Sequence, residues 1–261
     1  MDQEAVRAAF DDQVRRHVGL TGPDERVERQ GLVVRIISDG WSGVTWSDLD
    51  PAAADAVIAA QVDRFAQLAR PWEWKHYSYD RPADLPDRLV AAGLTPEPAE
   101  TVLVAAIADL VVDVPPPAGV RLMPVVDAQG VEAFVRMHHD VFGGDHSDIG
   151  RMLSAGLAQE LPSHLAVIAW SGETAVGAGR VELQPGTDFA SIWGGGTHPG
   201  WRGHGVFRSV VAHRAALAAA RGFRYLQVDA TPESRPILRR LGFVELATTT
   251  PFAGPILGNT V

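Results

Sequence analysis

Six glycines and one proline lie in the stretch WGGGTHPGWRGHGVF, from Trp193 to Phe207, and a helical pattern begins at its end. Glycines let another molecule lie against the main chain. The first N–H groups of a helix lack partners within the helix and carry the positive end of its dipole. Arg202 adds a positive charge. Residues of these types in this order predict an anion site, most naturally for phosphate.

Two common phosphate-binding motifs do not fit this stretch. A P-loop requires a lysine after its second glycine, and none follows a suitable glycine pair here. The dinucleotide-binding fingerprint requires a glycine at the position that Arg208 occupies. A purely structural tight turn is the alternative to the anion site.

A second group of reactive residue types lies in MHHDVFGGDHSD, from Met137 to Asp148. Carboxylates and imidazoles of this kind hold amines or ligate metals. The H-E-x-x-H spacing of a helical zinc site is absent, so we expect no metal. A solvated loop is the alternative interpretation of the cluster.

The elements that must position these residues alternate along the second half of the chain. Strand patterns at residues 190–195 and 225–229 flank a helical pattern at residues 206–221. A hairpin pattern precedes them, and a short helix and a further strand, at residues 243–247, follow. Strands that alternate with helices and hairpins predict a mixed α/β sheet.

Three consecutive prolines at residues 115–117 indicate a linker, because proline lacks the backbone donor and favours extended conformations. We therefore expect a first domain at residues 1–114, a linker at 115–118 and a second domain at 119–261. A helix–glycine–strand layout recurs around Gly93 and Gly242. Two copies of one small fold, the first degenerate, explain this repeat, and the alternative is that the layout is simply common.

The segment PGWRGHGVFRSVV resembles the signature of the GNAT superfamily, the acetyl-CoA-dependent N-acetyltransferases. The family pattern is [QR]-x-x-G-x-[GA]; Arg202 and Gly205 match it, and Phe207 departs from it. Downstream, ILRRLGF at residues 237–243 resembles the family's L-Y-x-K-L-G-F. The resemblance implies an α/β fold of two GNAT-like domains. Each is a mixed, mostly antiparallel sheet flanked by helices, with splayed central strands in the C-terminal one.

The resemblance also implies acetyl-CoA as co-substrate, bound at one site only, because the first half has nothing like RGHG. The pantetheine arm would lie between the splayed strands, and the pyrophosphate on the glycine-rich loop. The residues implied to bind acetyl-CoA are Gly195, Gly196, Thr197, Arg202, Gly203, His204, Gly205, Val206, Phe207, Thr231 and Ser234. Those expected to bind the acceptor are His139, Asp145, His146 and Trp193.

Acyl transfer to an amine needs a proton acceptor, because a free alkylammonium titrates at about pH 10. Glu182 and Asp229 are candidate bases. The alternatives are an ion pair of Glu182 with Arg180 and a turn-capping role for Asp229. His198 is a third candidate, acting through water.

Leu238 stands where many members of the family have a tyrosine that protonates the leaving thiolate. The nearest hydroxyls by sequence belong to Thr231 and Ser234, and Ser234 is our candidate for a catalytic role. The chain has no cysteine, which excludes a thioester on the enzyme. We therefore expect direct attack of the amine in a ternary complex.

Composition limits the partners. A net charge of −9 disfavours nucleic acid and anionic membranes. The N-terminus lacks a secretory pattern, and the absence of cysteine fits a reducing cytoplasm. We expect a cytoplasmic enzyme, monomeric or homodimeric, that acetylates a primary amine of a small molecule. A non-catalytic acyl-CoA-binding or regulatory module and a protein lysine acetyltransferase are the alternatives.

Overall fold

A computed structural model describes residues 1–20 and 24–255 of the chain. Residues 256–261, which fall within the predicted second domain, lie outside the described residues. No helix within the described part is long and apolar enough to cross a membrane.

In its described residues, 1–20 and 24 onward, the first half of the chain holds six strands and the helices that pack on them. The strands are β1 (Arg26–Gln30), β2 (Val33–Ile37), β3 (Gly43–Ser47), β4 (Glu73–Tyr77), β5 (Thr95–Pro96) and β6 (Glu100–Ala106). The helices are α1 (Gln3–Phe10), the π-helix η1 (Asp11–Arg16), α2 (Ala54–Leu68), α3 (Leu85–Ala91) and the 3-10 turn η2 (Ile107–Asp109).

The second half begins after the proline-rich segment. Its strands are β7 (Val120–Pro124), β8 (His164–Ser171), β9 (Thr174–Leu183), β10 (Phe189–Thr197), β11 (Tyr225–Ala230) and β12 (Val244–Ala253). Its helices are α4 (Ala128–Phe142), α5 (Ser147–Leu157), the 3-10 turn η3 (Pro199–Trp201), α6 (Val206–Ala220) and α7 (Arg235–Arg240).

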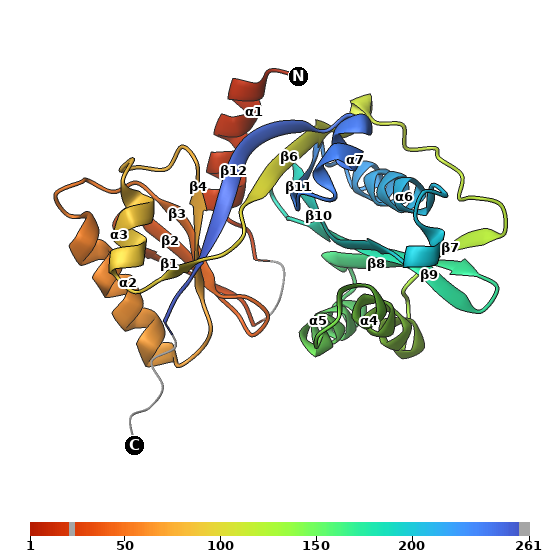
Figure 1. Cartoon of the computed structure of the whole chain (residues 1–261), viewed down its shortest axis with the longest axis horizontal. Helices are drawn as coiled ribbons and strands as arrows, with labels where there is room; N and C mark the ends of the chain where they lie inside the picture. Colours follow the sequence, from red (N-terminus) through yellow and green to blue (C-terminus); the bar gives the residue numbers. More distant parts are fainter. Residues whose placement is uncertain (21–23, 256–261) are drawn as a thin grey trace.

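Within the described residues, the strands join into one sheet of 12 strands. Its order is β1-β2-β3-β4-β12-β6-β11-β10-β9-β8-β7, with β5 paired to β12. Helices cover both faces (Figure 1): α6 and α7 lie on one side of the second half, and α4 and α5 lie on the other. We call these the α6 face and the α4 face. Leu226 and Val211 belong to the core of the α6 face, and Phe134 and Ile168 to the core of the α4 face.

The two halves exchange their last strands. Strand β6 of the first half pairs antiparallel with β11 of the second, from Ala106–Tyr225 to Thr101–Ala230. Strand β12 of the second half pairs with both β6 and β4. The domain boundary at residues 115–118 stays a prediction, and the pairing of strands crosses it in both directions.

Apart from the two-residue strand β5 and the 3-10 turn η3, the two halves share one order of elements, β3-α2-β4-α3-β6 and β10-α6-β11-α7-β12. Gly93 follows α3 with a φ of 90°, and Gly242 follows α7 with a φ of 106°, so both end a helix in the left-handed region. Asp48 and Asp50 precede α2 where glycines precede α6. The shared order supports duplication, and carboxylates at the start of α2 disfavour an anion there.

Candidate active site

Strands β10 and β11 run parallel and separate soon after they begin. Among the described residues they pair at three positions, Phe189–Tyr225, Ala190–Leu226 and Ser191–Gln227. The register of β10 against β9 then shifts between Trp193 and Gly196, which marks a β-bulge. The predicted splay of the two central strands is therefore confirmed, and it begins just after Ser191.

Arg214 of α6 supports the bulge from the α6 face. Arg214 is 1% exposed, and its Nη1 donates to the carbonyl oxygens of Arg180 (3.1 Å) and Trp193 (3.2 Å). Glycines make room for it, because a Cβ at Gly179 or Gly195 would lie 2.8 or 3.1 Å from guanidinium atoms. Burial, and then the charge of Arg180, lowers the pKa of Arg214 to about 9. This side chain fixes the backbone at the point where the strands part.

The glycine-rich loop leads directly into α6. Gly203 and Gly205 have φ values of 80° and 88°, and Gly205 is the N-cap residue, with no side-chain cap. A Cβ at either glycine would meet nothing within 4 Å, so the space above both is open. The N–H of Ser209 bonds to the carbonyl of Gly205, so the amides of residues 206–208 precede the first helical hydrogen bond. This loop fits a phosphate group.

The remaining predicted cofactor residues surround this loop. Gly196 and Thr197 end β10, and Arg202 and His204 lie exposed in the loop. The side chain of Val206 is buried. Phe207, which departs from the family pattern, packs against the core of the α6 face, with its ring 3.0 Å from a Cβ built on Gly195. Its side chain therefore fills space beneath the bulge.

Beyond Ser191 the separated strands β10 and β11 leave a gap between them, which we call the opening. Asp229 of β11 and Trp193 of β10 lie on opposite sides of it. Each comes two residues after the last β10–β11 pair, and both belong to the α4 face. The Asp229 side chain is 3% exposed and its Oδ2 accepts a hydrogen bond from Lys75 Nζ, while its Oδ1 has no partner. Lys75 Nζ also lies 5.4 Å from the centroid of the Trp193 ring, within cation–π range.

Lys75 belongs to β4 in the first half, and sequence reasoning missed it. The sequence did single this residue out, since Lys75 is the chain's one lysine among 23 lysine and arginine residues. Burial is the largest single effect and acts to lower the pKa of Lys75. The charges of Asp229, Tyr77 and Glu73 and the hydrogen bond to Asp229 together outweigh it and raise the pKa above its usual value. Lys75 therefore carries a positive charge at neutral pH.

Glu100 of β6 is a further residue that sequence reasoning missed. It lies next to Thr101, the partner of Ala230, and faces the same side of the sheet as Asp229. Burial, and then the charge of Asp229, raises its pKa to about 7. A carboxyl group with this pKa exchanges protons readily near neutral pH.

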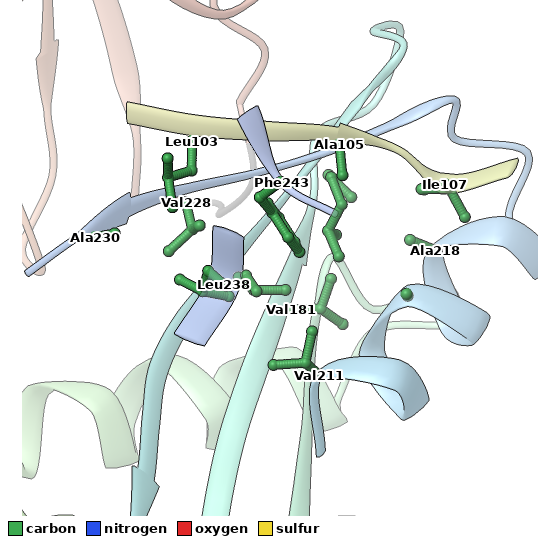
Figure 2. Close-up of a cluster of buried hydrophobic side chains, with 14 of the residues drawn as sticks. Leu103, Ala105, Ile107, Val181, Val211, Ala218, Val228, Ala230, Leu238 and Phe243 are labelled. Atoms are coloured by element: carbon green, nitrogen blue, oxygen red, sulfur yellow. The ribbon is translucent and has the colours of Figure 1, made fainter. Parts of the chain in front are cut away.

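The other predicted catalytic residues have local partners. Glu182 Oε1 accepts a hydrogen bond from Arg180 Nε at 3.0 Å, the ion pair that sequence analysis gave as the alternative. Ser234 Oγ lies 3.4 Å from Thr231 Oγ1, just before α7. Leu238 is 1% exposed and packs in the core of the α6 face (Figure 2). The position of the family's tyrosine is thus a core position here.

The predicted acceptor residues divide between two places. His139, Asp145 and His146 line a hollow of about 840 Å³ between α4 and α5, and Trp193 is not among its lining residues. Hydrogen bonds from the backbone N–H and the side-chain hydroxyl of Ser147 lower the pKa of Asp145. Among the described residues, no group of three or more metal-ligating side chains is present.

His138, rather than its neighbour His139, approaches the opening. It is buried, and its Nε2 would lie 2.4 Å from a Cβ on Gly194 of the bulge. Burial lowers the pKa of His138 to about 4, so it is neutral at physiological pH. The helical register of α4 makes this difference, because adjacent residues point to different sides.

Comparison with known proteins supports the same fold. Residues 132–243 match the model of the Acetyltransferase (GNAT) family. Among proteins with curated descriptions, none matches this chain. A GCN5-related N-acetyltransferase from Kribbella flavida is similar over 97% of this chain and 96% of its own, with 20% identity and a TM-score of 0.69.

Two further solved structures are similar over most of their length. A functionally unknown conserved protein from Staphylococcus epidermidis has a TM-score of 0.65 at 12% identity, over 94% of this chain and 96% of its own. A tandem GNAT protein from the clavulanic acid biosynthesis pathway has a TM-score of 0.61 at 13% identity, over 91% and 85%. At these identities the structures establish the fold, and the family model adds the family. Residues 132–243 of this chain therefore belong to the GNAT acetyltransferase family.

Proposed function

We propose that the protein transfers the acetyl group of acetyl-CoA to a primary amine of a small molecule, by direct attack in a ternary complex. The observation that carries the proposal is the opening between β10 and β11, with a bulge on one side and an uncapped, glycine-led helix start at its end. An extended amide-bearing chain fits along a free strand edge, and a pyrophosphate fits the helix start.

Several residues of the chain would hold acetyl-CoA. The backbone of Gly195, Gly196 and Thr197 offers a strand edge for the pantetheine arm, and the amides of residues 203–207 offer donors to the pyrophosphate. Bound acetyl-CoA supplies the thioester, whose sulfur leaves readily because a thiol has a pKa of about 8.5. Transfer therefore does not require a strong general acid to protonate the leaving sulfur. This is consistent with a buried leucine, Leu238, at the position where many family members have a tyrosine.

The proton of the amine must go to a base near the opening. Glu182 and Asp229, the candidates from the sequence, each form an ion pair, with Arg180 and Lys75 respectively, so both carboxylates already have a partner. Glu100 has a pKa of about 7 and lies on the same face as Asp229. Glu100 is therefore our leading candidate for the proton acceptor.

A second candidate function is a non-catalytic acyl-CoA-binding module. The burial of Leu238 at the usual tyrosine position favours it. It predicts binding of acetyl-CoA without turnover on any amine.

Calorimetric titration with acetyl-CoA tests the binding half of the proposal. Gly205→Asp places a carboxylate where the pyrophosphate would bind, and should weaken binding by about tenfold or more. Gly186→Asp is a matched control, because Gly186 also has a positive φ of 77° and open space around it, but lies in the turn before β10. Equal loss in both variants, or no binding by the unmodified protein, contradicts the proposal.

A further inference from the structure

The chain's only lysine reaches the opening from the other half of the molecule. Between β4, which carries Lys75, and β11, which carries Asp229, the sheet order places β12 and β6. In a flat sheet three such steps span at least about 14 Å. The ion pair of Lys75 with Asp229 therefore requires the sheet to curve, so that its α4 face is concave where the halves meet.

Asp229 is only half satisfied by this contact. Oδ2 accepts from Lys75, whereas Oδ1 is buried without a partner. A buried carboxylate oxygen without a donor costs free energy, because it has lost its hydrogen bonds to water. An N–H donor that binds beside Trp193 would satisfy it.

Several carboxyl groups lie around Asp229 and Lys75. Glu73 lies two residues before Lys75 on β4 and so faces the same side of the sheet, and the N–H of Glu97 bonds to Pro251, the β12 partner of Lys75. Burial, and then the charges of Asp229, Glu73 and Glu97, raise the pKa of Glu100. Against these four carboxyl groups stands one ammonium, that of Lys75. Such an excess of negative charge favours a ligand with more than one positive charge.

We propose that the acceptor is an alkyl diamine or longer polyamine. Its reacting nitrogen binds Asp229 Oδ1 beside Trp193, and its second ammonium lies toward Glu73 and Glu97. Lys75 is a positioning residue, which holds the Asp229 carboxylate in place. This inference rests on the proposed acetyltransferase function and names its substrate class.

The reaction balances with these groups. The acceptor enters as an ammonium and loses one proton before attack. Its nitrogen then bonds to the acetyl carbon as the carbon–sulfur bond breaks, and the nitrogen loses a second proton. One proton ends on the departing thiol and the other in solvent. The second ammonium of the diamine does not react.

Substrate competition tests the class. We expect kcat/KM for 1,4-diaminobutane to exceed that for butylamine by about tenfold, and 4-aminobutanoate to be the poorest of the three. Glu97→Gln removes an exposed charge and should lower kcat/KM for the diamine more than kcat/KM for butylamine. Glu160→Gln, an exposed carboxylate in the loop between α5 and β8, is the matched control and should change neither.

The single lysine provides a second readout that does not need turnover. In protein labelled with carbon-13 at the lysine ε position, Lys75 gives one methylene signal. We expect 1,4-diaminobutane to shift this signal, and Asp229→Asn to abolish the shift and raise KM for the diamine. Lys75→Arg should retain more diamine selectivity than Lys75→Met, because it keeps the charge. In each variant the Kd for acetyl-CoA should stay unchanged.

The outcomes separate the two proposals. No acetylation of any amine overturns the proposed function. Acetylation of all three amines without preference for the diamine, with the Lys75 signal unmoved, overturns the diamine site and leaves the acetyltransferase function intact. Preference for the diamine that survives both Glu97→Gln and Asp229→Asn also overturns the proposed site.

Discussion

At the residue scale, charge pairing separates the carboxylates of the site into two kinds. Glu182 and Asp229 each form an ion pair, with Arg180 and Lys75 respectively, so both carboxylates already have a cationic partner. Glu100 has no cation as close among the described residues, and its pKa rises to about 7 instead. The first two therefore suit binding, and Glu100 suits proton transfer.

The pH dependence of activity follows from Glu100. The groups that face it are Asp229 on β11, Lys75, Glu73 and Tyr77 on β4, and Glu97 before β6, while β12 presents Thr249. A base must be unprotonated to accept a proton, so kcat/KM should rise as pH increases through about 7. Glu100→Gln should lower the rate and remove this rise. If kcat/KM of Glu100→Gln rises with the same midpoint pH as that of the unmodified protein, the assignment of Glu100 as the base is contradicted.

Leu238 illustrates a residue whose role is packing. Leu238→Ala should destabilise the protein by about 2–5 kcal/mol, because it leaves a cavity in a packed core. The matched control is Leu161→Ala, since Leu161 is 74% exposed and its truncation should cost less than about 0.5 kcal/mol. Urea unfolding of both variants measures the difference. Equal midpoints would show that Leu238 is not a core residue.

At the element scale, the bulge of β10 and the start of α6 act together. Local sequence predicted both, because glycines and a proline at the end of a strand pattern stop pairing and a helical pattern begins at residue 206. The contribution of Arg214 was not predictable, because an arginine within a helical pattern normally faces solvent. Only the glycines at 179 and 195, seen together in space, reveal the room that it fills.

Arg214→Met should disturb the bulge while keeping the length of the side chain. Two carbonyl oxygens, of Arg180 and Trp193, would lose their donor. We expect KM for acetyl-CoA to rise by about tenfold, with a smaller change in KM for the amine. Arg221→Met, at the exposed end of α6, is the control. An unchanged KM for acetyl-CoA in Arg214→Met argues against a role for the bulge.

An acid-labile ion pair network joins β1, β2 and α2. Hydrogen bonds from Arg64, and then from Arg35, lower the pKa of Glu28 to about 2, although burial opposes them. The stabilisation is complete above the unfolded pKa of about 4.5 and is lost as pH falls toward 2. Thermal unfolding should show Glu28→Gln less stable than the unmodified protein at pH 6, with the gap closing toward pH 2. A gap independent of pH contradicts this.

At the scale of the whole molecule, strand exchange places residues of the first half in the site of the second. The glycine-rich loop, α6 and the parting strands were predictable because they are local patterns. The partners of β6 and β12 were not, and β12 extends to Ala253, past the predicted end at residue 247, because β4 provides it with a further partner. Lys75 and Glu100 escaped prediction for the same reason: their place in the site depends on long-range pairing.

Strand exchange predicts that a break in the linker will not separate the halves. A protease site inserted at residues 115–118 and then cleaved should leave the two fragments associated, because β6 pairs with β11 and β12 pairs with β4 and β6. Size-exclusion chromatography after cleavage measures this. Elution as two independent fragments would contradict the exchanged arrangement.

The central claim is that the opening between β10 and β11 binds acetyl-CoA and delivers its acetyl group to an amine. The most direct measurement is release of free thiol from acetyl-CoA in the presence of 1,4-diaminobutane, with mass spectrometry of the product. We expect amine-dependent thiol release, a mass increase of one acetyl group on the diamine, and loss of both in Gly205→Asp but not in Gly186→Asp. Binding of acetyl-CoA without thiol release on any amine would contradict it.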